Sequence, residues 1–281
     1  MITLRETFQK YFSDHQALPA FNIDSFEIFQ AVEMAVSETK LPCLVQLSQN
    51  EDKFIEAEKL FLLVKKAQLN NLPIYLNMDH CHDLNRMVNL VKLGFDMVHF
   101  DGSNLDYQEN LDTATALVKK LKEINPNIVV EVEFNKINLI ENGVNPESFT
   151  NPKQALEFIS KTQADLLAIS IGNIHGVNTS TPETINLDLF TQIVGVLPNH
   201  FFTLHGGSGI DLAQIKSAIR LGIVKININT DLRLAFKKSL LTSINSSPSE
   251  KIYDYLSPAI DDVKKIAIEK LTNFSLTNTI N

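Results

Sequence analysis

The chain has few cysteines and no block of positive charge, and both absences restrict its function. Its only cysteines are Cys43 and Cys81, in 281 residues, and they lack the spacing of a disulfide framework. We therefore expect a protein of the reducing cytoplasm. The formal net charge is −8, so neither nucleic acid nor an anionic membrane is an expected partner.

Long apolar runs are also missing. No run approaches the roughly 20 residues that a membrane-spanning helix needs, and the first residues carry charge early, unlike a signal peptide. No low-complexity linker divides the chain. Because 44% of the residues are hydrophobic, the chain can bury a large core, and we expect residues 1–281 to form a single domain.

Short β-rich runs alternate with helical patterns along the chain. The runs are nearly continuously apolar, which indicates strands buried on both faces and therefore a parallel sheet. The expected strands are Leu18–Ile23, Cys43–Leu47, Ile74–Met78, Met97–Phe100, Ile128–Phe134, Leu166–Ile171, Phe202–Leu204 and Ile223–Ile228. Eight such units predict an α/β fold, the closed (β/α)8 or TIM barrel, with a C-terminal helical extension near 232–241 and 259–271. A doubly wound open sheet is the alternative.

Three histidines stand at the ends of expected strands. His80 follows Asp79 after the run 74–78, while His175 and His205 close two later runs and each precede a glycine. The carboxyl ends of barrel strands meet on one face, where active sites lie. Three neutral imidazoles can bind one zinc ion there and leave a coordination position for substrate. The alternative is three unrelated histidines, each satisfied by hydrogen bonds.

A glycine-rich turn follows the seventh expected strand. The run Gly206-Gly207-Ser208-Gly209 comes directly after His205, and Asn229-Thr230 opens the helix after the eighth strand. Glycine lets backbone N–H groups turn toward an anion, and a helix N-terminus adds positive potential. The position is the usual phosphate site of such barrels, so the pattern predicts a phosphate cradle. The alternative is a tight turn in which Thr230 is an ordinary N-cap.

Carboxylates occupy the expected barrel interior. Glu131 and Glu133 alternate along the fifth strand and so share one face, and Asp101 follows the fourth strand. Buried carboxylates are costly unless they meet a cation or hydrogen-bond donors. The three residues are therefore candidates for supporting the metal or its histidine ligands. For Glu131 and Glu133, a polar barrel layer closed by a lysine or arginine is an equally good interpretation.

The run Asp79-His80-Cys81-His82 cannot supply four ligands to one ion. Neighbours in an extended segment point in opposite directions. We interpret Cys81 as a small packing residue and His82 as exposed or helix-capping.

At these residues the chain resembles the class II, metal-dependent ketose-bisphosphate aldolases. The resemblance extends from Ala20-Phe21-Asn22-Ile23 to Tyr255-Leu256-Ser257-Pro258-Ala259. It is densest at Met78-Asp79-His80, Phe100-Asp101-Gly102-Ser103, Ile171-Gly172-Asn173-Ile174-His175-Gly176, Leu204-His205-Gly206-Gly207-Ser208-Gly209 and Lys225-Ile226-Asn227-Ile228-Asn229-Thr230. The resemblance implies a barrel enzyme that reversibly cleaves a ketose bisphosphate to dihydroxyacetone phosphate and an aldehyde. Fructose 1,6-bisphosphate, which yields glyceraldehyde 3-phosphate, is the leading substrate, and tagatose 1,6-bisphosphate is the second.

The resemblance also implies roles by position. His80, His175 and His205 would bind a zinc ion that polarises the ketone. Asp79 would be the acid/base for the aldehyde-side oxygen, and Glu141 the loop carboxylate for proton transfer on the substrate. The residues implied to bind dihydroxyacetone phosphate are Gly176, Gly206, Gly207, Ser208, Asn227, Asn229 and Thr230. Family members often use a monovalent cation near the phosphate, and we expect a homodimer or higher homo-oligomer.

Three positions depart from the family pattern. Cys81 replaces the glycine after the Asp-His pair, and the loop 135–143 lacks a Gly-Gly pair. Tyr253 stands where the family has an arginine for the distal phosphate. These departures motivate a rival, a non-catalytic homologue that binds metal and sugar phosphate, although Asp79 and the histidines are intact. A metal-dependent barrel hydrolase is a further rival, which the glycine-rich cradle fits less well.

Overall fold

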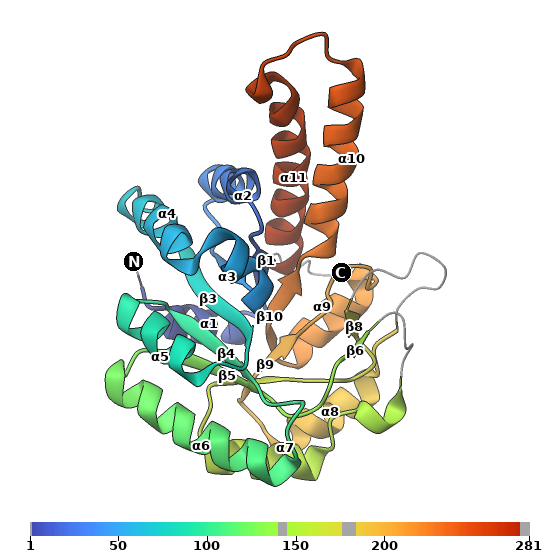
Figure 1. Cartoon of the computed structure of the whole chain (residues 1–281). Helices are drawn as coiled ribbons and strands as arrows, with labels where there is room; N and C mark the ends of the chain where they lie inside the picture. Colours follow the sequence, from blue (N-terminus) through green and yellow to red (C-terminus); the bar gives the residue numbers. More distant parts are fainter. Residues whose placement is uncertain (1, 140–144, 176–183, 276–281) are drawn as a thin grey trace.

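Eight parallel strands close into a barrel in the computed structural model, which describes residues 2–139, 145–175 and 184–275 (Figure 1). The strand order around the barrel is β1-β10-β9-β7-β5-β4-β3-β2. The barrel strands are β1 (Leu18–Asn22), β2 (Cys43–Leu47), β3 (Ile74–Cys81), β4 (Met97–Asp101), β5 (Val129–Glu133), β7 (Leu166–Ala168), β9 (Phe201–Leu204) and β10 (Ile223–Ile228). This confirms the TIM barrel and excludes the doubly wound sheet.

Helices cover the outside of the barrel (Figure 1). They are α1 (Leu4–Ser13), α2 (Phe26–Thr39), α3 (Gln49–Ile55), α4 (Ala57–Leu69), α5 (Leu84–Leu93), α6 (Tyr107–Ile124), η2 (Pro146–Ser148), α7 (Pro152–Thr162), α8 (Leu187–Val196), α9 (Leu212–Leu221), α10 (Thr230–Ser246) and α11 (Ile252–Ser275). Local sequence determines several ends. The Asp83 side chain caps α5, and Gly94 ends that helix in the left-handed region.

The two halves of the barrel interior differ in polarity. Toward the amino ends of the strands, buried apolar residues such as Leu44, Met97 and Leu166 pack against Phe8 of α1. Toward the carboxyl ends, the buried residues are polar or charged and include Gln46, Asn77, Asp79, His99, Glu131, His205, Lys225 and Asn227. The apolar half stabilises the fold, and the polar half is the place for chemistry.

Several elements differ from the sequence-based expectations. Helices α1 and α3 and the two-stranded sheet of β6 (Asn138–Leu139) and β8 (Ile174–His175) were not predicted. The C-terminal extension is a longer helical hairpin than expected, because α10 continues past residue 241 through Ser246 and α11 extends over Ile252–Ser275. Figure 1 shows α10 and α11 projecting side by side from the barrel. Among the described residues, no helix combines the length and apolar character needed to cross a bilayer.

Candidate active site

A bulge in β3 places both Asp79 and His80 at the site. The register with β4 shifts between Met78 and Cys81, and His80 has a left-handed backbone with φ of 47°. A non-glycine residue in this conformation is strained, and such strain is often found at functional sites. The bulge interrupts the strict alternation of an extended strand. Cys81 is buried, as expected for a packing residue. His82 is exposed, and its Nδ1 lies 2.6 Å from the carbonyl oxygen of Asp101.

Four groups surround the Asp79 carboxylate. Its Oδ2 accepts hydrogen bonds from Gln46 Nε2 and Asn227 Nδ2, each at 3.0 Å. Its Oδ1 lies 3.5 Å from Lys225 Nζ and 3.3 Å from His99 Nδ1. Burial opposes a charge on Asp79, but Lys225 and His80 outweigh it and hold its pKa well below the usual range. Asp79 is therefore held as the charged carboxylate.

His80 and His205 each have a carboxylate beside one ring nitrogen. His80 Nδ1 lies 2.9 Å from Asp101 Oδ2, and His205 Nε2 lies 2.8 Å from Glu131 Oε1. Such pairs fix the orientation of metal-binding imidazoles. Burial, reinforced by His80, lowers the pKa of His205 to about 3, so this ring is neutral as a metal ligand must be.

Glu131 fits both interpretations of the buried carboxylates, since it contacts a histidine and is also paired with a lysine. Its Oε1 contacts His205, and its Oε2 lies 2.9 Å from Lys225 Nζ, with both side chains fully buried. Glu133 Oε2 lies 3.7 Å from His80 Nδ1 and 3.4 Å from His99 Nε2. The polar barrel layer and the support of the histidines are thus one network.

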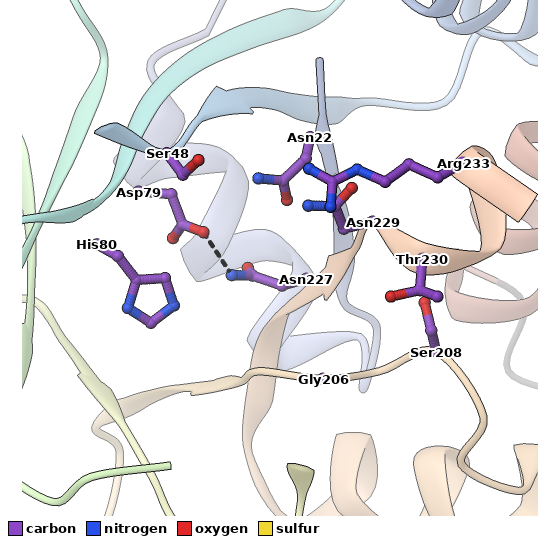
Figure 2. Close-up of a pocket in the computed structure, with 10 residues that line it drawn as sticks. All are labelled: Asn22, Ser48, Asp79, His80, Gly206, Ser208, Asn227, Asn229, Thr230 and Arg233. Atoms are coloured by element: carbon purple, nitrogen blue, oxygen red, sulfur yellow. Dashed lines mark hydrogen bonds between the residues drawn. The ribbon is translucent and has the colours of Figure 1, made fainter. Parts of the chain in front are cut away.

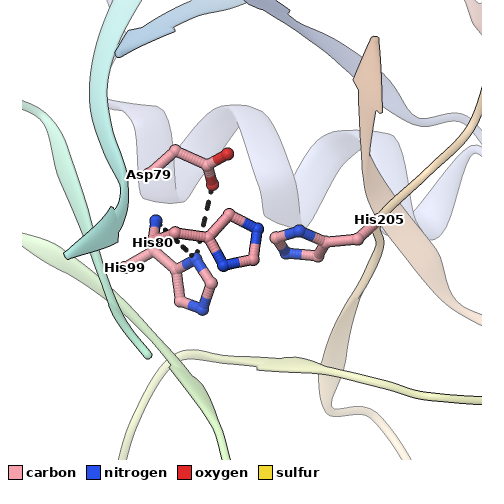
Figure 3. A group of neighbouring side chains, drawn as sticks. All are labelled: Asp79, His80, His99 and His205. Carbon is pink, nitrogen blue, oxygen red and sulfur yellow. Dashed lines mark hydrogen bonds and ion pairs between the residues drawn. The ribbon is translucent and has the colours of Figure 1, made fainter. Parts of the chain in front are cut away.

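His99 of β4 belongs to this network, although the sequence did not draw attention to it. Figure 3 shows Asp79, His80, His99 and His205 grouped together, and their ligand atoms all lie within 4.8 Å of one another. Burial opposes a charge on His99, but Glu131, Asp79 and Glu133 outweigh it and raise its pKa to about 10. The alternation of side chains along β4 could have identified His99, because it precedes the candidate Asp101 by two residues and therefore lies on the same face of the strand.

A cavity of about 320 Å³ opens above this network (Figure 2). Its lining residues are Asn22, Ser48, Asp79, His80, Gly206, Ser208, Asn227, Asn229, Thr230 and Arg233. Gly206 has φ of 65°, and a Cβ atom there would overlap the carbonyl oxygen of Ile174. Only glycine fits this turn, which lets the chain pass beside the cavity.

The N-terminus of α10 faces the same cavity. Asn229 is the N-cap residue, but its side chain makes no capping bond and instead donates to Glu51 Oε1 at 3.2 Å. The backbone N–H of Asp231 points to Ser208 Oγ at 3.4 Å. Thr230 is the first helical residue, so the alternative in which it caps the helix is wrong. The Gly207 N–H donates to the Asn227 carbonyl oxygen at 3.1 Å and holds the turn against β10.

Arg233 is a second residue that the sequence analysis missed. It lies one helical turn after Thr230 and lines the cavity, where it contacts Asp24 Oδ2 at 2.9 Å and Glu51 Oε1 at 2.6 Å. Its spacing could have identified Arg233 from the sequence, because it follows Thr230 by three residues and residues three or four apart share one helix face.

The family model for class-II fructose-bisphosphate aldolase matches residues 2–279. The chain belongs to this family. It is therefore a class II aldolase, a carbon–carbon lyase.

Named relatives of this aldolase differ in substrate. The fructose-bisphosphate aldolase of Ureaplasma parvum is 30% identical and aligns over 100% of this chain and 99% of its own length. The sulfofructosephosphate aldolase of Alkalicoccus urumqiensis is also 30% identical, over 90% of this chain and 87% of its own. The crystal structure of the YdjI aldolase from Escherichia coli K12 superposes with a TM-score of 0.84 at 26% identity, covering 98% and 97% of the two chains.

The described part of the aldolase includes most of the predicted site. Asp79, His80, Asp101, Glu131, Glu133 and His205 form one connected group, and Gly206, Ser208, Asn227, Asn229 and Thr230 line the cavity above it. His175 ends β8, and the structure describes its backbone but not its side chain. Nearby, Asn173 Nδ2 donates to the carbonyl oxygen of His205 at 3.1 Å. Glu141 and Gly176 lie outside the described residues.

Proposed function

We propose that this aldolase cleaves a ketose 1,6-bisphosphate reversibly to dihydroxyacetone phosphate and an aldehyde, with a zinc ion held by His80, His175 and His205. Fructose 1,6-bisphosphate is the leading substrate and tagatose 1,6-bisphosphate the second. The observation that carries the proposal is the position of Asp79, His80 and the cradle residues on the wall of one cavity. The donor set fits zinc, because His205 is a neutral imidazole and buried carboxylates orient it and His80.

The phosphate of the dihydroxyacetone half would bind at the start of α10. Ser208, Asn229 and Thr230 line the cavity with polar side chains, and the N-terminus of the helix adds positive potential. A monovalent cation would bind beside this phosphate, as it often does in the family. The cradle would hold the substrate so that its carbonyl carbon faces the histidine cluster.

Asp79 would transfer the proton at the aldehyde-side oxygen. A bound zinc ion would polarise the substrate ketone and stabilise the negative charge that develops there. As the charged carboxylate, Asp79 would accept the proton of the aldehyde-side hydroxyl during cleavage and return it during condensation. Gln46 and Asn227 hold the carboxylate in place through its Oδ2. Glu141 would serve the other proton transfer, on the dihydroxyacetone side.

Among the described residues that line the cavity, Arg233 is the one arginine or lysine, and it is the candidate for the far end of the substrate. Helix α10 has 17 residues and is therefore about 25 Å long, so Tyr253, beyond its far end, cannot reach the cavity of its own chain. Arg233 can reach it and would contact a terminal anion. The anion could be the phosphate of a bisphosphate or the sulfonate suggested by the name of one relative.

The helical hairpin is proposed to contact a second copy of the chain. Leu234, Leu241, Ile244 and Ile252 are exposed by 52%, 53%, 52% and 62% along this projecting element. Apolar residues gathered on a projecting arm commonly mark an interface. A homodimer is the simplest assembly, and light scattering of the purified protein measures its mass directly.

A cytoplasmic location is proposed from the cysteines. Cys43 and Cys81 are both buried and unpaired. Burial raises the pKa of the Cys81 thiol to about 11, which makes it inert. Such thiols suit a reducing compartment.

A coupled assay for dihydroxyacetone phosphate tests the proposal. The panel should contain fructose and tagatose 1,6-bisphosphates, the two matching 1-phosphates and a sulfonated fructose phosphate. Turnover of one bisphosphate would support aldolase action on that sugar. Binding of all of them without any turnover would support the non-catalytic alternative instead.

A further inference from the structure

We propose that Glu51 is a positioning residue that sets the specificity for the far end of the substrate, because it fixes the guanidinium of Arg233 at the cavity. The inference rests on the proposed function, in which Arg233 contacts a terminal anion. Glu51 lies on α3, and its carboxylate contacts three residues that line the cavity, namely Asn22, Asn229 and Arg233.

The carboxylate of Glu51 is surrounded by hydrogen-bond donors. Its Oε1 accepts from Arg233 Nη2 at 2.6 Å and from Asn229 Nδ2 at 3.2 Å. Its Oε2 accepts from the Ser48 backbone N–H at 2.7 Å and from Asn22 Nδ2 at 2.9 Å. Glu51 is only 5% exposed. Because a rotation of this carboxylate would break several buried hydrogen bonds at once, its position is fixed.

Helix α3 is itself attached to its neighbours on two sides. Arg86 of α5 donates from Nε and Nη2 to the two carboxylate oxygens of Asp52, each at 2.8 Å. Toward the barrel, Gln49 Nε2 donates to the carbonyl oxygen of His80 at 3.1 Å. Bidentate arginine–carboxylate pairs are strong and directional. The helix that carries Glu51 is therefore the rigid support that a positioning residue needs.

Two carboxylates hold Arg233 and leave one of its nitrogens available. Nη2 donates to Glu51, and Nε donates to Asp24 Oδ2 at 2.9 Å. Within residues 2–139, 145–175 and 184–275, Nη1 has no protein partner. The Asp24 side chain is 32% exposed and that of Glu51 only 5%, and an exposed pair contributes little because water screens it. Glu51 is therefore the contact that determines where Nη1 points.

Glu51 is also connected to the acid/base candidate. Asn22, which donates to Glu51, accepts through Oδ1 from Gln46 Nε2 at 2.9 Å, and the same nitrogen donates to Asp79 Oδ2 at 3.0 Å. Figure 2 shows Asn22 between the side chains of Asp79 and Arg233. This series of hydrogen bonds fixes the spacing between the acid/base group and the cation for the far end, so that a substrate of matching length is held in place.

Glu51→Gln separates the two sides of this contact. An amide has one acceptor oxygen, so it cannot accept from the donors that face both oxygens of Glu51. Either Arg233 loses its acceptor, or the side chain at position 51 loses its anchors Ser48 and Asn22. In both cases the guanidinium is no longer fixed. Asp24→Asn is the matched control, because it removes an equal charge beside the same guanidinium from an exposed position.

Binding of sugar alcohols tests the inference without turnover. Hexitol 1,6-bisphosphate and hexitol 1-phosphate lack the ketone, so calorimetry on the purified full chain gives the ratio of affinities that the terminal phosphate produces. We expect this ratio to fall about tenfold in Glu51→Gln, because a charge-assisted hydrogen bond is lost. In Asp24→Asn the ratio should change by less than about threefold. If Glu51→Gln does not fold, Glu51→Asp replaces it with the same expectation, since its shorter side chain cannot reach Arg233.

A double variant distinguishes positioning from a general loss of stability. In Arg233→Met no guanidinium remains to be positioned, so the addition of Glu51→Gln should not change the ratio further. An unchanged ratio in Glu51→Gln, equal weakening of both ligands, or a further loss in the double variant would overturn the inference. A native ratio near one would also overturn it. None of these measurements uses cleavage, so a failure of the sugar cleavage assay would contradict the proposed function alone.

Discussion

Lys225 Nζ lies 2.9 Å from Glu131 Oε2 in the centre of the barrel, and both side chains are fully buried. The same lysine lies 3.5 Å from Asp79 Oδ1, while Glu131 also contacts His205. One ion pair therefore connects the acid/base candidate to a metal-ligand candidate. Lys225 keeps both carboxylates charged, since it is a leading cause that lowers the pKa of each.

Lys225→Met should destabilise the fold strongly. The change leaves Glu131 as a buried charge without its cation, and breaking a buried pair in this way costs about 3–5 kcal/mol. Urea unfolding of the metal-free chain measures the loss. The double variant with Glu131→Gln should recover part of it, and equal losses in the single and double variants would show that the pair is not coupled.

Asp79→Ala should abolish most carbon–carbon cleavage while the barrel stays folded. A positioned acid/base contributes about 10²–10⁴-fold, so kcat should fall by that factor. Exchange of the dihydroxyacetone phosphate proton should decrease less, because Asp79 serves the aldehyde side. Cleavage within threefold of the native rate would remove Asp79 from the mechanism; near-ultraviolet circular dichroism controls for folding.

The barrel could be predicted because its strands are buried on both faces. Runs such as Leu166–Ile171 are apolar at nearly every position, and this distinguishes a parallel sheet from other arrangements. Helix α1 was not predicted, because its apolar residues Leu4 and Phe8 pack against the end of the barrel and local sequence does not reveal such a tertiary contact. Helix α10 was predicted too short, since its polar last turn resembles a loop.

Site residues that follow the ends of strands could be predicted from the sequence. Those whose position depends on tertiary contacts were missed. Asp79, His80 and His205 follow apolar runs, so their convergence follows from the topology of the barrel. His99 lies within β4 and looks like an interruption of an apolar strand until its neighbours are known. The bulge at His80 was equally hidden, because it depends on the register with β4.

Arg233→Met should reduce the preference for a bisphosphate over the matching 1-phosphate. A guanidinium contact to a phosphate contributes about 1.5–3 kcal/mol, which corresponds to roughly 10–100-fold in kcat/KM for the bisphosphate only. The exposed Arg220 on α9 is the matched control, and Arg220→Met should leave both substrates unchanged. A bisphosphate preference that survives in Arg233→Met would assign the distal contact to another residue, for example one from a second copy.

Asp96→Asn should change the pH dependence of stability. Burial raises the pKa of Asp96 to about 6, above its value in the unfolded chain, so the folded chain binds the proton more tightly. The native chain should therefore lose stability relative to the variant as the pH rises through about 6. Asp96 keeps partial exposure to solvent, so we expect the effect on the free energy of unfolding to change by about 1 kcal/mol between pH 5 and pH 8, measured by denaturant unfolding. A pH-independent difference would contradict the raised pKa.

Cleavage of fructose 1,6-bisphosphate with and without a metal chelator tests the central claim most directly. The purified protein should release dihydroxyacetone phosphate, lose that activity when the chelator removes its metal, and regain it when zinc is added. His80→Ala should stay inactive after the same zinc addition, because it removes a proposed ligand at the cavity wall. Full cleavage by the chelated, metal-free protein would contradict the account, as would zinc-restored activity in His80→Ala.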